Sequence, residues 1–236
     1  SICNNLDIKN PLIVTDKGSP KLPFIINLKS YLNSSNVKSD LFFDISPSPR
    51  EDEISNGVKK FKDGNHDSII AIGGGSAMDG GKLICLTANN DVPLRDFEFE
   101  LTPPKISKDN PFPKIITIPT TAGTGAETEI TAMVTYLKEG MKFCMWHPDV
   151  RPSLALLDPE LTVGLPANLT AWTGADALIH GIEGYCVPGF NPMCDGAALE
   201  GLSLISKSLV TAVEDPSNIV ARGGMHVGSC LAGISF

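Results

Sequence analysis

The 236 residues carry 19 Lys and Arg against 27 Asp and Glu, a net charge of −8 at pH 7, and 42% of them are hydrophobic. This balance excludes intrinsic disorder and collagen-like structure, and the length suits one or two domains. No basic run indicates a nucleic-acid partner. No apolar run approaches the roughly 18–20 residues of a membrane span, and residues 1–10 do not resemble a secretory signal. The six cysteines form no CxxC pair, so we expect reduced thiols in a cytoplasmic protein.

Short apolar runs alternate with helical patterns over the first two thirds of the chain. The predicted strands are 11–15, 40–45, 67–72, 114–118 and 153–157, and the predicted helices are 24–32, 50–61 and 76–88. Residues 130–136 and 141–145 are predicted to form a hairpin, and the proline-rich residues 102–113 a loop. Nearly continuous apolar strands between helices are typical of a mostly parallel sheet covered on both faces.

The pattern becomes helical throughout from about Pro166, with helices predicted near 166–187, 194–213 and 218–236. Pro188, Pro192 and Pro216 are expected to separate these helices. The fold class that follows is an α/β domain and then an all-α domain. We place the domains at residues 1–160 and 161–236.

A glycine turn, Gly73-Gly74-Gly75-Ser76, directly follows a predicted strand and opens a helix. Glycines let the backbone approach a bulky anion, and the free amides of a helix start favour a phosphate. The run does not match the GxGxxG pattern, because Met78 stands where the third glycine belongs. Taken alone, the turn is equally well explained as a phosphate-binding loop or as a tight strand-to-helix connection.

A second polar loop follows another predicted strand, with hydroxyls at Thr120, Thr121 and Thr124 among two glycines. Each loop by itself could be an ordinary turn, but one long ligand would explain both. Asp16, at the end of the first strand, could accept hydrogen bonds from a ribose diol and would repel a 2′-phosphate, which favours NAD over NADP. The alternative for Asp16 is a turn or helix-capping residue.

Asp176 and His180 lie four residues apart in a predicted helix, so both occupy one face, which Glu183 roughly shares. A carboxylate and a neutral imidazole together suit Fe²⁺ or Zn²⁺. A salt bridge is the alternative, because two ligands do not close a metal site.

Four motifs, in this order and spacing, resemble the iron-containing (group III) alcohol dehydrogenase family. They are GGGSAMDGGK at 73–82, PTTAGTGAE at 119–127, LLDP at 156–159 and TGADALIH at 173–180. The resemblance runs over nearly the whole chain. It implies a Rossmann-like dinucleotide-binding domain, a helical domain, and an active site in the cleft between them. It also implies a homodimer.

The resemblance assigns roles residue by residue. Asp16 would hold the adenosine ribose, and Gly74, Gly75 and Ser76 would hold the pyrophosphate, with Asp79 nearby. Thr120, Thr121 and Thr124 would line the cofactor channel, and Lys142 would bind the nicotinamide-side ribose. Asp176 and His180 would be two of four metal ligands. No catalytic residue is expected beyond the metal site. The family's other two ligands are histidines in a helical stretch beyond Ala232-Gly233-Ile234, and its opening β-hairpin precedes the equivalent of Ser1. We therefore expect the chain to be truncated at both ends.

The predicted function is hydride transfer between NAD(H) and a small alcohol or aldehyde, assisted by Fe²⁺, with Zn²⁺ as the other candidate. Two alternatives stay open. The chain could bind nucleotide but be catalytically incomplete, or it could be a metal- and NAD-dependent enzyme of the glycerol dehydrogenase or dehydroquinate synthase type.

Overall fold

Five strands form one sheet in the computed structural model, which describes residues 2–236. The strand order is β2-β1-β3-β4-β7. The strands are β1 (Pro11–Asp16), β2 (Asp40–Ile45), β3 (Ser68–Gly73), β4 (Lys114–Pro119) and β7 (Leu154–Ala155). β1 pairs in parallel with both β2 and β3, and Leu12 lies opposite Asp40 on one side and Ile69 on the other. Every residue of β3 is buried, as expected for a parallel strand with both faces covered.

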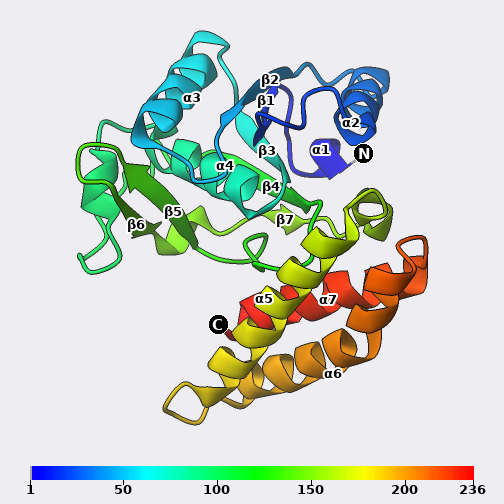
Figure 1. Cartoon of the computed structure of the whole chain (residues 1–236). Coiled ribbons are helices and arrows are strands. Elements are labelled where there is room, and N and C mark those ends of the chain that lie inside the picture. The colour runs from blue at the N-terminus through cyan, green and yellow to red at the C-terminus, as the bar shows by residue number, and fades with distance from the viewer. Residues whose placement is uncertain (1) are drawn as a thin grey trace. The chain divides into compact units, whose positions relative to one another are not determined.

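Three helices connect and cover these strands: α2 (Pro23–Ser34), α3 (Glu51–Asp63) and α4 (Gly75–Ala88). The chain passes from β1 to β2 and then back past β1 to β3, so right-handed crossovers place α2 and α3 on opposite faces of the sheet. Figure 1 shows α2 on one side of the strands and α3 and α4 on the other. The three predicted helices are confirmed, with small shifts at their ends.

An antiparallel hairpin, β5 (Thr131–Tyr136) and β6 (Met141–Trp146), packs against α4. Its side chains alternate between two faces, and Val134 and Met145 on the inner face are fully buried. Two short 3₁₀ helices, η1 (Leu94–Phe97) and η2 (Pro148–Val150), flank it. The predicted hairpin is confirmed. It groups with the α/β part of the chain and not with the C-terminal helices.

The chain divides into two units. The first comprises residues up to Thr117 together with Ile130–Leu154, and the second comprises Ile118–Glu129 and Ala155–Phe236. The second unit holds η3 (Pro159–Thr162) and the helices α5 (Ala167–Cys186), α6 (Pro192–Glu214) and α7 (Ile219–Ser235).

All three long helices of the second unit contact one another. Their shared core consists mainly of small residues with Ile205 and Met225, so the helix backbones approach closely. The prediction of an α/β region followed by helices is confirmed.

The structure departs from the sequence prediction at three places. A short N-terminal helix, α1 (Ile2–Asn5), was not predicted. The predicted strand at 153–157 is only the two-residue β7, because the chain turns into η3 directly afterwards. Helix α6 begins two residues before its predicted start, at Pro192, since a proline has no amide hydrogen to lose and is favoured at the first helical position.

One described helix, α6, is long and apolar enough to cross a membrane by length and composition. A single such helix is weak evidence for a span, because core helices of soluble proteins meet the same criteria. α6 contacts both α5 and α7 in this structure.

Candidate functional site

The glycine turn has the geometry of an open strand-to-helix connection. β3 ends at Gly73, whose φ is +146°, a conformation that side-chain-bearing residues rarely adopt. A Cβ added to Gly73 would lie 2.7 Å from the Cβ of Ala77 and 3.3 Å from Oδ2 of Asp16. Gly74 then caps α4 in an extended conformation, without a side-chain cap. The amides of Gly75 and Ser76 are therefore available to an anion such as a phosphate, whereas those of Ala77 and Met78 donate to the carbonyl of Gly74 at 3.0 and 3.3 Å.

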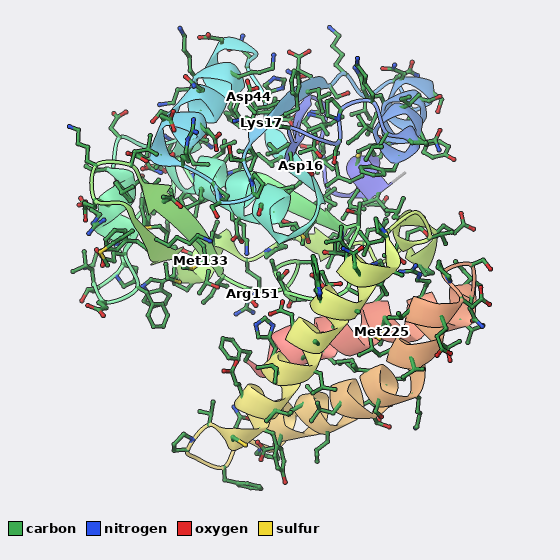
Figure 2. All side chains as sticks on the ribbon, in the orientation of Figure 1. Asp16, Lys17, Asp44, Met133, Arg151 and Met225 are labelled. Atoms are coloured by element: carbon green, nitrogen blue, oxygen red, sulfur yellow. The ribbon has the colours of Figure 1, made fainter. Side chains whose placement is uncertain are left out.

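Asp16 lies at the end of β1, next to the glycine turn (Figure 2). Its Oδ1 accepts a hydrogen bond from the amide of Gly18 at 2.9 Å, and its Oδ2 accepts one from the hydroxyl of Ser19 at 2.8 Å. The carboxylate thus organises the turn after β1, which is the alternative considered from the sequence. Each carboxylate oxygen has a second lone pair, so this role does not prevent binding of a ribose diol.

Ser76 and Asp79 tie the first turns of α4 to neighbouring segments. The Ser76 hydroxyl donates to the carbonyl of Pro47 at 2.6 Å. Asp79 accepts a hydrogen bond from the amide of Met133 in β5 at 3.2 Å and lies 3.5 Å from the ammonium of Lys82. Burial raises the pKa of the Asp79 carboxyl, and the nearby charges of Lys82 and Lys142 oppose this rise.

Sequence reasoning assigned no role to Lys82, which is fully buried and donates to the carbonyl of Thr131 at the start of β5. Together with Asp79 it fastens α4 to the hairpin that carries Lys142. Lys142 itself is exposed on β6, opposite Thr135. The i, i+3 spacing of Asp79 and Lys82 indicates that the two side chains pair on one helix, but no local pattern indicates their contacts with the hairpin.

The threonine loop, residues 118–129, belongs to the second unit although its first two residues are the end of β4. Thr120, Thr121 and Thr124 are each partly exposed, and the Thr124 hydroxyl accepts a hydrogen bond from the amide of Ala126 at 3.3 Å. Ala122 and Gly123 between them are buried. The hydroxyls are thus presented by a loop whose small residues are anchored in the helical unit.

Asp176 and His180 lie side by side on α5, with 3.8 Å between Oδ1 of Asp176 and Nε2 of His180. The other ring nitrogen of His180, Nδ1, is buried and has no hydrogen-bond partner among the described residues. Glu183 is exposed on the same helix. A carboxylate oxygen and an imidazole at this spacing fit two positions of a divalent metal site. No group of three or more His, Cys, Asp or Glu able to hold a metal occurs within residues 2–236.

Two buried polar residues of α7 were not identified as important from the sequence. Arg222 is 2% exposed and donates to the hydroxyl of Thr170 at 2.8 Å and to the carbonyl of Pro216 at 3.1 Å. His226, one turn further, is 1% exposed, and neither ring nitrogen has a partner among the described residues. Burial lowers the pKa of His226 to about 4, opposed by the charge of Asp158 and assisted by that of Arg222.

Comparison with known proteins adds two family matches. Residues 1–159 match the model of iron-containing alcohol dehydrogenase, and residues 170–236 match the model of the C-terminal region of the Fe-containing alcohol dehydrogenase family. Among individual relatives, the 1,3-propanediol dehydrogenase of Klebsiella pneumoniae is 35% identical over 99% of this chain and 60% of its own length. The NAD-dependent methanol dehydrogenase of Bacillus methanolicus is 34% identical over 97% of this chain and 58% of its own length.

Solved structures agree with these matches. The crystal structure of a 1,3-propanediol oxidoreductase superposes with a TM-score of 0.94 at 34% identity, covering 100% of this chain and 60% of the other. Sulfoacetaldehyde reductase from Bifidobacterium kashiwanohense, solved in complex with NAD⁺, superposes with a TM-score of 0.87 at 32% identity, covering 100% and 61%. The chain thus spans about 60% of the length of these relatives. Since the two family models together match most of its residues, the chain belongs to the iron-containing alcohol dehydrogenase family.

Proposed function

We propose that this chain carries the dinucleotide-binding part and two metal ligands of an NAD-dependent oxidoreductase that interconverts a small alcohol and its aldehyde or ketone. The observation that carries the proposal is the Asp176–His180 pair on α5, with Nε2 of His180 3.8 Å from Oδ1 of Asp176, in a chain that also has an open glycine turn at the end of β3. Neither feature alone indicates this chemistry, but an oxidoreductase of this family needs both.

The cofactor would be held by backbone more than by side chains. The amides of Gly75 and Ser76 at the start of α4 would bind the pyrophosphate, and the carboxylate of Asp16 would bind the adenosine ribose. The hydroxyls of Thr120, Thr121 and Thr124 would contact the cofactor, and Lys142 the ribose on the nicotinamide side. NAD fits better than NADP, because the charge of Asp16 would repel a 2′-phosphate.

Asp176 and His180 would hold the metal, which we propose to be Fe²⁺, with Zn²⁺ as the alternative. When bound, the metal would supply Lewis-acid polarisation of the substrate oxygen and NAD would accept the hydride. The carboxylate of Asp176 would compensate part of the metal's charge. His180 must be neutral to act as a ligand, so protons compete with the metal for its imidazole.

The test for the metal pair is titration of the protein with Zn²⁺ and, without oxygen, Fe²⁺ by calorimetry. Asp176→Asn and His180→Gln should each weaken binding at least tenfold, on the order of the loss caused by removing a ligand or its support. Glu183→Gln is the matched control, because Glu183 is an exposed carboxylate on the same helix. Equal effects of all three variants, or none, would refute the assignment of the metal ligands.

The test for the nucleotide site compares NAD⁺ with NADP⁺. Asp16→Asn keeps an acceptor for the amide of Gly18 and removes the negative charge, so the preference for NAD⁺ should shrink without loss of the turn. Asp63→Asn, which removes an exposed charge at the end of α3, should leave the preference unchanged. Turnover is then assayed as NADH formation with primary alcohols and diols.

A second candidate function is supported by the small number of metal ligands among the described residues. Among residues 2–236 no third ligand joins Asp176 and His180, whereas a catalytic zinc usually has three protein ligands. On this alternative the chain binds NAD⁺ but binds metal only weakly and does not turn over. Micromolar or tighter Zn²⁺ binding would exclude it. Chemistry of the glycerol dehydrogenase or dehydroquinate synthase type is distinguished by the substrate panel.

We also propose a cytoplasmic location, a homodimer, and a domain division at residues 1–160 and 161–236. The free state of all six cysteines supports the location, because thiols stay reduced in the cytoplasm. Light scattering on the purified protein tests the homodimer, and expression of the two segments tests the division.

A further inference from the structure

The last turn of α7 contacts the threonine loop backbone to backbone. A Cβ added to Gly233 would lie 2.7 Å from Cα and 2.8 Å from the carbonyl oxygen of Gly125. Real Cβ atoms essentially never come closer than 3.0 Å, and here the opposing atoms are backbone, so no side-chain rotation could relieve the overlap. Gly125 has a φ of +69°, a left-handed conformation that a side-chain-bearing residue would rarely adopt, so both sides of this contact require glycine. The absence of a side chain at Gly233 therefore determines where the loop lies on α7.

The same loop also contacts α5 closely. A Cβ added to Gly123 would lie 2.8 Å from Cβ and 2.9 Å from the carbonyl oxygen of Thr173. Thr173 precedes Asp176 by three residues and His180 by seven, so all three lie on one side of α5. The loop is thus enclosed by α7 through Gly125 and by α5 through Gly123.

The last turn of α7 completes this arrangement by contacting α5 directly. A Cβ added to Gly184 would lie 2.5 Å from the hydroxyl of Ser235 and 2.9 Å from its carbonyl oxygen. The ring of Phe236 packs against the imidazole of His180 in a tilted arrangement, with 5.2 Å between ring centroids and 36° between ring planes. One helical turn therefore contacts the threonine loop on one side and the segment of α5 that bears the metal pair on the other.

We propose that Gly233 and Phe236 are positioning residues for the reaction proposed above: Gly233 sets the threonine loop that contacts NAD, and Phe236 orients the imidazole of His180. The inference rests on the proposed function for its consequences in binding, but the packing that it describes can be tested without it. A shift of about 1 Å in groups that position reactants reduces rates by up to about 10²-fold. A packing contact this close to both groups is thus able to control affinity and turnover.

The test is Gly233→Ala in the full chain, with hydrogen–deuterium exchange read by mass spectrometry. Exchange of the amides in residues 118–129 should accelerate on the order of tenfold relative to the wild type, because the added methyl group displaces Gly125. The dissociation constant for NAD⁺ should increase, whereas a merely structural role would change thermal stability and leave the NAD⁺ affinity of the folded fraction unaltered.

Two glycines of the same helix provide matched controls. A Cβ at Gly223 would meet nothing closer than 4.0 Å, so Gly223→Ala should leave both loop exchange and NAD⁺ affinity unchanged. A Cβ at Gly228 would lie 2.7 Å from Cγ1 of Ile205 in α6, so Gly228→Ala should destabilise the α6–α7 contact. Loop exchange that accelerates equally in Gly228→Ala and Gly233→Ala would overturn the role of Gly233, as would no acceleration in Gly233→Ala.

Phe236→Ala tests the proposed role of Phe236 in orienting His180, and this test remains possible if Gly233→Ala does not fold. Phe236 is 63% exposed, so its truncation should not unfold the helices. We expect several-fold weaker Zn²⁺ binding by calorimetry, with loop exchange unchanged, and unaltered Zn²⁺ affinity would overturn the role of Phe236. If the wild type binds neither NAD⁺ nor Zn²⁺, the proposed function fails, while the exchange data still decide whether Gly233 positions the loop.

Discussion

Acidification should destabilise the second unit through His226 in α7. Folding buries its imidazole without a hydrogen-bond partner among the described residues, and burial lowers its pKa from 6.5 to about 4. Between these two values the unfolded chain binds a proton that the folded chain excludes. The stability contributed by the neutral imidazole is therefore fully present above pH 6.5 and is lost progressively as the pH falls toward 4.

The size of the effect follows from the two pKa values. A shift from 6.5 to about 4 corresponds to about 3 kcal/mol once the pH is well below 4. At pH 5 the same two values predict a loss of about 2 kcal/mol relative to pH 7.5. The charges that act on the ring are Asp158, which favours its protonated form, and Arg222, which disfavours it.

The assay is urea unfolding at pH 7.5 and pH 5, comparing the wild type with His226→Leu. Fluorescence of Trp172 in α5 reports on the second unit, and a Trp146→Phe background removes the signal of the hairpin. The variant should lose about 2 kcal/mol less than the wild type between the two pH values, because leucine has no proton to bind. Equal losses in the two proteins would refute the reasoning, whatever their absolute stabilities.

Three further substitutions test the packing. Arg222→Met should lower the free energy of unfolding by about 2–4 kcal/mol, because it removes the donor to the Thr170 hydroxyl and to two backbone carbonyls in a buried site. Chemical denaturation measures this loss, and a loss below about 1 kcal/mol would contradict the prediction. Gly81→Ala should cost about 1–3 kcal/mol, since its Cβ would lie 2.6 Å from the Cβ of Ala71 in β3, and a melting temperature equal to that of the wild type would argue against this close contact. Gly223→Ala should instead stabilise the chain by about 0.5–1 kcal/mol, because it removes a helical glycine without a clash; a lower melting temperature would count against it.

Much of the candidate site was predictable because its residues occur in local patterns. A glycine run between an apolar strand and a helical pattern predicts a tight strand-to-helix turn, and the structure has Gly74 capping α4. Asp176 and His180 are neighbours because a helix brings residues four apart together, and the 3.8 Å separation confirms that they lie side by side. The roles of these residues in binding NAD and metal stay predictions.

Other features of the site depend on contacts between distant segments and were not predictable. The pair of Asp79 and Lys82 fastens α4 to the hairpin, which only the packing of β5 on α4 reveals. The burial of His226 likewise follows from the way α7 packs within its unit, since nothing in the local sequence distinguishes it from an exposed histidine.

Periodicity and short-range chemistry were enough to predict most of the helices and strands, the change from α/β to all-α structure, and the motifs of the family. Only the folded chain shows that residues 118–129, the first two of which end β4, pack with the helices. The physical reason is steric: Gly123 and Gly125 allow the loop backbone to approach Thr173 and Gly233 more closely than any side chain would permit, and such complementarity exists only once the helices are folded together.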